Sequence, residues 1–313
     1  MMLGIATPVI WVLLSLVALL AMSSLVIRLQ QIKNPHKNQQ ELQARIRSWW
    51  VILILFSLAI VIHPVISLIF FAFLSFLALK EYLSLIPTRR ADHQVLFWAY
   101  AAIPVQYYWI GLHWYGMFVI FIPVFAFLFL PMRMVLRGET DGFLKAVGTL
   151  HWGLMLMVFN LSHVAYLLVL PAEKNISGSG GAGLVLFIII CTQLNDIAQY
   201  VWGKSFGKHK VIPKVSPNKT WEGLLGGVFT TTLLSVFLAP WLTPLSSYYA
   251  VLAGILISMS GFIGDVTISA LKRDLGVKDS GNLIPGHGGI LDRVDSLTFT
   301  APLFFHLIYY LYY

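Results

Sequence analysis

Acidic, basic and glycine residues that could bind phosphate and a cation lie together near the C-terminal end of the sequence. The segment 269–295 reads SALKRDLGVKDSGNLIPGHGGILDRVD, in which lysines and arginines stand among aspartates. Glycines let the backbone approach a ligand closely, and successive N–H groups in such a loop can bind an anion. This segment is therefore a candidate site for a phosphate compound.

Two further aspartates lie within long apolar runs of the sequence. Asp196 belongs to the run 183–202 and Asp265 to the run 247–271, and each lies toward the basic end of its run. A carboxylate within a membrane helix is costly and is by default a sign of function. An ion pair between Asp265 and a basic residue at the end of its own helix is the simpler explanation. The second embedded aspartate argues against it.

The segment 203–223 contains five lysines and one histidine in the sequence GKSFGKHKVIPKVSPNKTWEG. Its glycines and prolines are incompatible with a long helix. Cationic side chains and exposed amides that converge form a phosphate cradle, although a loop enriched in lysine on one membrane face is the alternative. A Walker A loop is excluded because G-x-x-x-x-G-K-[ST] is absent.

Aspartates among cationic residues suit a site that binds a divalent cation and phosphate together. Mg²⁺ takes one or two carboxylates and leaves the rest of its coordination shell to water and substrate phosphate. The histidines are scattered and the chain has one cysteine, so a zinc site is not expected. His287 is expected to contact phosphate or to orient its loop.

The elements that position these residues must be membrane helices. Of the 313 residues, 58% are hydrophobic and 11% are charged, which excludes a soluble globular domain. Apolar runs long enough to span a bilayer must be helical, because the backbone has no other hydrogen-bond partners in lipid. We predict an all-α polytopic protein with about ten helices, or nine with one re-entrant piece. The predicted runs are 5–27, 49–63, 64–86, 95–113, 114–132, 148–170, 183–202, 222–241, 247–271 and 296–313.

Basic residues predict the orientation of these helices. With ten crossings, alternate loops hold all of the 21 lysines and arginines except Lys174. Loops enriched in this way face the cytoplasm, so both termini are expected outside and the site at the cytoplasmic helix ends. The net charge of +8 then reflects one cationic membrane face and not a nucleic-acid partner. The expected location is the bacterial inner membrane.

We divide the chain into three regions. Residues 1–94 would form N-terminal transmembrane helices, and residues 95–180 would form middle helices that include a candidate dimer contact. Residues 181–313 would form the catalytic region, because they contain both polar segments and both embedded aspartates.

The pattern S-x-x-K-R-x-x-x-x-K-D-x-G-x-x-x-P-x-H-G-G-x-x-D-R-x-D, from Ser269 to Asp295, resembles the signature of the phosphatidate cytidylyltransferases (CDP-diacylglycerol synthases) at every fixed position. The stretch FGKHKVIPKVSPNKTWEG is similar to a second block of that family, and the resemblance covers residues 183–313. It implies transfer of a cytidylyl group from CTP to phosphatidate, giving CDP-diacylglycerol and pyrophosphate in phospholipid biosynthesis. It also implies Mg²⁺, surrounding membrane lipids and a homodimer.

The resemblance implies a role for each matching residue. The catalytic residues would be Asp265, Lys272, Arg273, Lys278, Asp279, His287, Asp292 and Arg293. Substrate would be bound by Asp196, Lys208, Lys210, Lys214, Ser216, Lys219, Thr220, Glu222, Ser269, Gly288, Gly289 and Asp295. One or two Mg²⁺ ions would be held by Asp265, Asp292 and Asp196.

Two departures from the family pattern leave other functions open. Asp196 is followed by Ile-Ala-Gln-Tyr where the family commonly has a small residue and Gly-Ala-Tyr, and Asn218 stands where lysine or glycine is usual. A lost glycine beside a ligand could reshape the pocket, so a specialised paralogue acting on another lipid phosphate is one alternative. A transporter of an anionic lipid or solute is another, as is an inactive scaffold protein.

Overall fold

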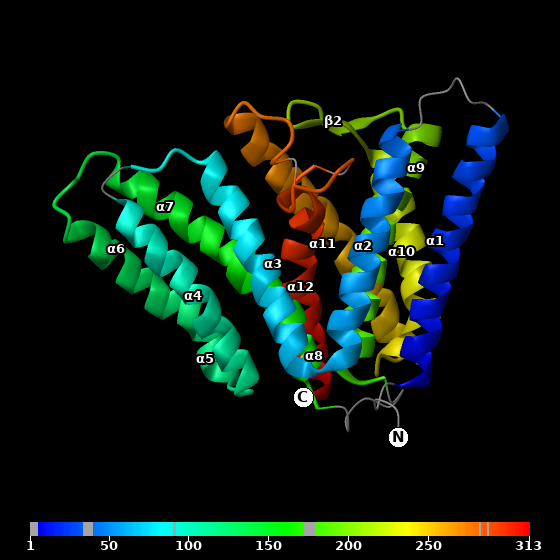
Figure 1. Cartoon of the computed structure of the whole chain (residues 1–313), viewed down its shortest axis with the longest axis horizontal. Helices are drawn as coiled ribbons and strands as arrows, with labels where there is room; N and C mark the ends of the chain where they lie inside the picture. Colours follow the sequence, from blue (N-terminus) through cyan, green and yellow to red (C-terminus); the bar gives the residue numbers. More distant parts are fainter. Residues whose placement is uncertain (1–5, 34–39, 90–91, 172–178, 282, 287) are drawn as a thin grey trace.

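The structure is a computed structural model that describes residues 6–33, 40–89, 92–171, 179–281, 283–286 and 288–313. The described residues form ten long helical segments that run between two opposite faces of the molecule (Figure 1). Two of these segments contain a π-helical stretch, η2 or η3. The segments are α1 (Thr7–Lys33), α2 (Gln40–Ile62), α3 (Pro64–Leu85), α4 (His93–Gly111), the continuous α5, η2 and α6 (Tyr115–Ile120, Phe121–Ala126, Phe127–Val135), the continuous α7, η3 and α8 (Phe143–Leu154, Met155–Asn160, Leu161–Val169), α9 (Gly180–Phe206), α10 (Trp221–Leu242), α11 (Ser247–Asp274) and α12 (Leu291–Tyr312).

The composition of these segments confirms an all-α polytopic membrane protein. Eight of the described segments are long and apolar enough to cross a membrane. The other two, α4 and α12, run alongside them between the same faces (Figure 1). Each of the ten apolar runs in the sequence corresponds to one segment. The described part of the chain thus forms ten helical segments, and eight of them have the length and composition of a membrane span.

The predicted division between the second and third helices falls at His63-Pro64. α2 ends at Ile62 and α3 begins at Pro64. Proline is favoured at the first helical position, because the amide that it lacks would have no partner there. The amide of Val65 donates to Nδ1 of His63 at 3.2 Å, so the histidine caps α3. The histidine cap and the proline therefore start a new helix directly after α2, and the chain reverses direction at this dipeptide.

The C-terminal half packs around a buried asparagine, Asn195 of α9. Its Oδ1 accepts hydrogen bonds from Thr231 Oγ1 of α10 at 3.1 Å and from Ser258 Oγ of α11 at 2.5 Å. A Cβ added to Gly261 of α11 would lie 3.2 Å from Asn195 Nδ2, so this glycine permits the close approach. Small and hydroxyl residues are typical of such contacts between membrane helices. Asn195 thereby joins three helices directly beside Asp196.

Replacing this asparagine by leucine should destabilise the protein. Asn195→Leu leaves the hydroxyl groups of Thr231 and Ser258 buried without this acceptor, and each loss costs about 1–3 kcal/mol. We expect a lower midpoint of thermal unfolding in detergent. Leu194→Ala is the matched control, since Leu194 is 41% exposed on the same helix. An equal midpoint for the two variants would contradict this role of Asn195.

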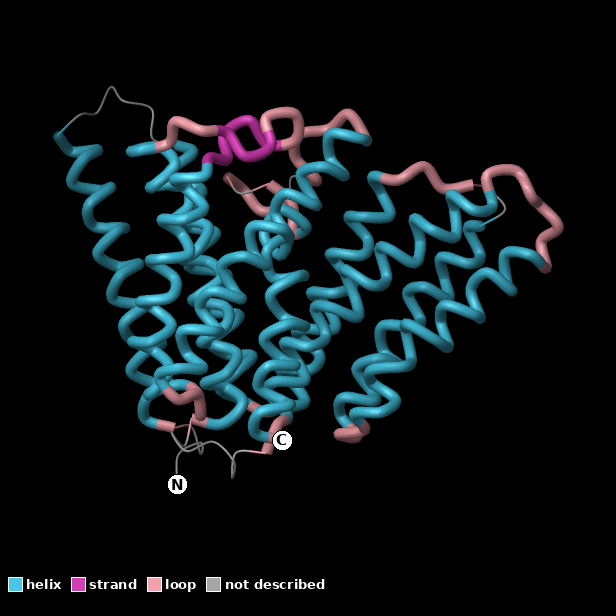
Figure 2. Tube along the Cα trace, turned by 180° about the vertical axis from the view of Figure 1, so that it is seen from behind, coloured by secondary structure: helices cyan, strands magenta, loops and turns pink. Residues whose placement is uncertain are grey.

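A short hairpin lies between α9 and α10. β1 (Lys210–Ile212) and β2 (Ser216–Thr220) are antiparallel, and Lys210 pairs with Thr220. The hairpin, magenta in Figure 2, lies across the helix ends at one face, where β2 contacts α9 and α11. The sequence correctly predicted a break in helix here but did not predict strands.

The first helix begins and the last helix ends on the face opposite the hairpin. Figure 1 shows α1 beginning and α12 ending at the lower face, while the hairpin and the loop before α12 lie at the upper face. This arrangement agrees with the predicted even number of crossings. The face that carries the hairpin is called the polar face below.

Candidate active site

Two lysine–aspartate ion pairs lie where α9, α10, α11 and α12 meet the polar face. Lys219 Nζ is 2.6 Å from Asp265 Oδ2, and Lys272 Nζ is 2.6 Å from Asp292 Oδ1. Each pair joins residues far apart in the sequence, and all four side chains are less than one quarter exposed. Partial burial strengthens such pairs relative to surface ones, because solvent screens them less. The two predicted polar segments and Asp265 therefore form one site.

Asp265 lies on α11 and pairs with Lys219, which lies near the end of β2. Besides its ion pair with Lys219, it accepts a hydrogen bond from Ser269 Oγ, one turn along the helix, at 3.3 Å. Lys219 Nζ also donates to Gln199 Oε1 at 3.1 Å and lies 5.6 Å from the centre of the Phe262 ring. The ion-pair partner is thus Lys219, and not a basic residue of its own helix as the simpler explanation required.

Asp292 lies in the first turn of α12, where a negative charge interacts favourably with the helix dipole. Its Oδ2 accepts hydrogen bonds from Ser280 N at 3.0 Å and Gly289 N at 3.2 Å, and it lies 2.9 Å from Ser280 Oγ. Gly288 has φ +81°, and an added Cβ there would lie 2.9 Å from Asp292 Oδ2. Both conditions require glycine, so Gly288 lets the loop fold onto this carboxylate.

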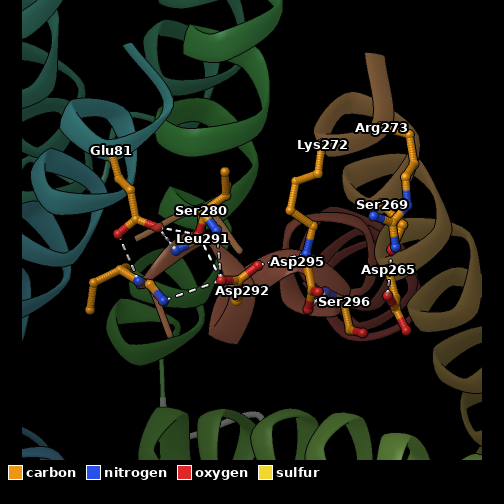
Figure 3. A network of polar contacts seen from close by, with 12 residues as sticks. Glu81, Asp265, Ser269, Lys272, Arg273, Ser280, Leu291, Asp292, Asp295 and Ser296 are labelled. Carbon is orange, nitrogen blue, oxygen red and sulfur yellow. Dashed lines mark hydrogen bonds and ion pairs between the residues drawn. The ribbon is translucent and has the colours of Figure 1, made fainter. Parts of the chain in front are cut away.

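Three carboxylates gather between α9, α11 and α12. Asp196 accepts a hydrogen bond from Ser296 Oγ at 3.1 Å, and Asp295 accepts one from Ser296 N at 2.7 Å. Asp295 lies within electrostatic range of both Asp196 and Asp265. Figure 3 shows Asp295 between Asp265 on one side and Asp292 on the other. Three carboxyl groups thus lie close together near the two lysines.

The predicted metal ligands divide between these groups. Asp196 and Asp265 lie with Asp295, whereas Asp292 is bonded to Lys272, Ser280 and Gly289. Within the described ranges, no three histidine, cysteine, aspartate or glutamate residues form a group that could hold a metal ion by themselves. A bound ion would need oxygen atoms from water or substrate as well.

Several predicted substrate-binding residues make contacts within the protein. Glu222 accepts hydrogen bonds from Lys208 N at 3.0 Å and His209 N at 3.2 Å, and pairs with His209 Nδ1 at 2.6 Å. Thr220 Oγ1 accepts from Gly223 N at 3.1 Å and so caps α10. These contacts fix the hairpin to the start of α10, which sets the position of Lys219.

The other predicted residues lie around this centre. Ser216 is half-buried in β2, and Arg273 Nε donates to Val215 O of the hairpin at 3.4 Å. Arg293 lies close enough to Asp196 to influence its charge. His287 lies outside the described residues. The predicted residues that are exposed at the polar face are Lys208, Lys210, Lys214, Arg273, Lys278, Asp279 and Arg293.

Sequence analysis missed one residue of the site, Glu81 of α3. Its carboxylate accepts hydrogen bonds from Ile290 N at 2.8 Å, Leu291 N at 3.2 Å and the hydroxyl of Ser280. A signal was available, because Glu81 is the single acidic residue of the apolar run 64–86. Asp196 and Asp265 were identified because each is likewise the single acidic residue of its apolar run.

Comparison with known proteins shows the family. The profile described as "Cytidylyltransferase family" matches residues 43–311. "Uncharacterized protein YnbB" of Escherichia coli strain K12 is 51% identical over 296 residues, which are 95% of this chain and 97% of that protein.

Two named enzymes are similar to part of the chain. The phosphatidate cytidylyltransferase of Staphylococcus epidermidis strain RP62A is 42% identical over 126 residues, or 40% of this chain and 48% of the enzyme. That of Haemophilus influenzae is 41% identical over 135 residues, or 42% of this chain and 47% of the enzyme. The match spans about half the length of these relatives. Because the family profile covers most of the chain, the chain belongs to the cytidylyltransferase family of nucleotidyltransferases.

Proposed function

We propose that this protein transfers the cytidylyl group of CTP to the phosphate of phosphatidate, releasing pyrophosphate and forming CDP-diacylglycerol. The observation that carries the proposal is the pair of lysine–aspartate contacts, Lys219 with Asp265 and Lys272 with Asp292, at one face of a membrane protein. A lipid phosphate reaches such a site laterally from the bilayer, and a nucleotide reaches it from the aqueous side. The similarity to phosphatidate cytidylyltransferases supports this choice of acceptor.

The proposed reaction is an in-line displacement at phosphorus. An oxygen of the lipid phosphate attacks the α-phosphorus of CTP, and the bond from that phosphorus to the oxygen bridging it to the β-phosphorus breaks. Pyrophosphate leaves with the bonding electron pair. Positioning and charge neutralisation supply most of the catalysis in such transfers. Lys219 and Lys272 would exchange their carboxylate contacts for phosphate oxygens.

The residues of the site fit Mg²⁺, which remains part of the proposal. Asp196 and Asp265 offer hard oxygen ligands from two helices, with Asp295 close to both, and water and substrate would supply the other ligands of the ion. Asp265 and Asp196 would hold one ion, and Asp292, which is paired with Lys272, would help to hold a second. When bound, Mg²⁺ neutralises developing charge on the phosphates.

We also propose a location and an assembly. Lysines and arginines concentrate in loops on the cytoplasmic side of membrane proteins, which would place the polar face in the cytoplasm of a bacterial cell and the protein in the inner membrane. A homodimer is expected from the family resemblance. The mass of the detergent-solubilised protein would test the assembly.

Incubation of the purified protein with radiolabelled CTP, Mg²⁺ and a panel of lipid phosphates tests the function. We expect a labelled CDP-lipid with phosphatidate and an equal amount of pyrophosphate. A product formed with another lipid phosphate alone would identify a specialised paralogue. Movement of an anionic solute across vesicles without consumption of CTP would replace the proposal with a transporter, and neither activity would indicate a scaffold.

Lys219→Ala should raise the concentration of CTP needed for half-maximal rate. Lys219 is the lysine nearest Asp265, and loss of one charge-assisted contact to phosphate costs about 1.5–3 kcal/mol, or about 10- to 100-fold in KM. Steady-state rates at varied CTP measure this change. Lys145→Ala is the control, because Lys145 is exposed on α7 and belongs to neither polar segment. An unchanged CTP dependence would leave Lys219 with a structural role.

A further inference from the structure

We infer that Glu81 of α3 is a positioning residue that holds the loop before α12 at Ser280 and at residues 289–291, and through it Asp292, in the geometry needed for catalysis. Glu81 comes from the N-terminal half of the chain, outside the segment that resembles the family signature. It contacts the loop and not the ion pairs themselves, so it would act through other residues. The activity measurements below rest on the proposed function, whereas the hydrogen-exchange measurement does not.

The hydrogen bonds of Glu81 are the first support. Its Oε2 accepts from Ile290 N at 2.8 Å, and its Oε1 accepts from Leu291 N at 3.2 Å. Amides at the start of a helix have no partner within the helix, and a carboxylate there satisfies them and complements the helix dipole. Glu81 therefore fixes the start of α12, one residue before Asp292 (Figure 3).

Ser280 links Glu81 to Asp292. The Ser280 hydroxyl contacts Glu81 Oε1 and lies 2.9 Å from Asp292 Oδ2, while Ser280 N donates to that same Oδ2 at 3.0 Å. Ser280 is 5% exposed, so this linkage is protected from water. A displacement of Glu81 would be transmitted to both ends of the loop, and hence to the orientation of the Asp292 carboxylate.

The glycines of the loop are the second support, and they change the expected role of Gly289. A Cβ added to Gly289 would collide with Glu81 Oε1 and Ser280 Oγ. A Cβ added to Gly281 would lie 3.2 Å from Glu81 Cδ. Gly289 was predicted to let the backbone approach substrate. In the structure, the Glu81 carboxylate occupies the space where a side chain at position 289 would lie.

Hydrogen exchange tests the positioning directly. In Glu81→Ala, the amide protons of Ile290 and Leu291 lose their acceptor and should exchange faster, while those of α9 should not. Lys80→Ala is the matched control, because Lys80 is exposed beside Glu81 on α3. Unchanged exchange at both amides would overturn the inference even if the protein proves to have no cytidylyltransferase activity.

Activity measurements separate positioning from folding. Residues that orient a ligand group typically account for about 10- to 100-fold in activity, so we expect Glu81→Ala to lower kcat by about 30-fold with little change in the KM for CTP. Glu81→Gln keeps the length and one acceptor oxygen but turns the other into a donor that faces a donor, so it should lose part of the rate and less than Glu81→Ala. A loss confined to KM, or equal losses in both variants with an unaltered unfolding midpoint, would contradict the assignment.

A double substitution supplies an independent test. Gly289→Ala should lower kcat by about 100-fold, because the new methyl group displaces Glu81. Once Glu81→Ala has removed that carboxylate, adding Gly289→Ala should cost less than about threefold, since substitutions at contacting residues are not additive. Additive losses would show that Gly289 acts independently of Glu81.

Discussion

Asp265→Asn should lower the rate of cytidylyl transfer by about 1000-fold, which corresponds to about 4 kcal/mol of transition-state stabilisation. Asparagine has the same shape as aspartate, but it removes the charge that pairs with Lys219 at 2.6 Å and that would hold Mg²⁺. The change is therefore electrostatic and not steric. Asp265 is about one quarter exposed, so the folded protein should tolerate the amide.

The measurement is the initial rate of CDP-lipid formation at saturating CTP and Mg²⁺. Asp274→Asn is the matched control, because Asp274 ends the same helix, α11, and is exposed. Membrane insertion and the unfolding midpoint should stay at the wild-type values. A rate within threefold of wild type would remove Asp265 from the metal site.

Asp292→Asn should lower the rate by a similar factor, about 1000-fold, and should also destabilise the protein. The Lys272 side chain is 14% exposed and the Asp292 side chain 8%, so the substitution leaves a largely buried ammonium group without its partner. Breaking a buried ion pair in this way costs about 3–5 kcal/mol. We expect a lower unfolding midpoint in detergent together with the loss of rate.

The double variant Asp292→Asn, Lys272→Met separates these two effects. Removing both charges eliminates the unpaired ammonium group, so the unfolding midpoint should recover toward wild type. The rate should not recover, because Lys272, which would contact a substrate phosphate, and Asp292, which would help to hold Mg²⁺, are both absent. Recovery of the rate with the midpoint would mean that the pair serves folding alone.

The helices could be predicted from the sequence because lipid allows the backbone few alternatives. The break at His63-Pro64 was identified from length and from proline, and the structure has the helix boundary there. The second helix begins nine residues earlier than predicted, at Gln40 and not at Trp49. Its first turns are polar, and hydropathy detects the part of a helix that lies in lipid and not the part that extends into water.

The partners of the site residues could not be predicted in the same way. Embedded aspartates showed that Asp196 and Asp265 matter, but charge alone did not indicate that Lys219, and not Lys272, pairs with Asp265. That choice depends on the hairpin, whose strands are too short to give a hydrophobic pattern. The place of Glu81 in its run was visible in the sequence, but its partners were not, because two of them are backbone amides and the third is Ser280, 199 residues away.

The pairing of the two lysines has a consequence for the selection of ligands. Each ammonium group is already neutralised by a carboxylate, and a neutralised pair attracts distant ions weakly in physiological salt. A small anion such as inorganic phosphate could displace one carboxylate but would leave that carboxylate uncompensated. A nucleotide bearing three linked phosphates and its own counter-ion can compensate both groups at once. If the proposed function holds, we therefore expect the unliganded site to bind inorganic phosphate more weakly than CTP.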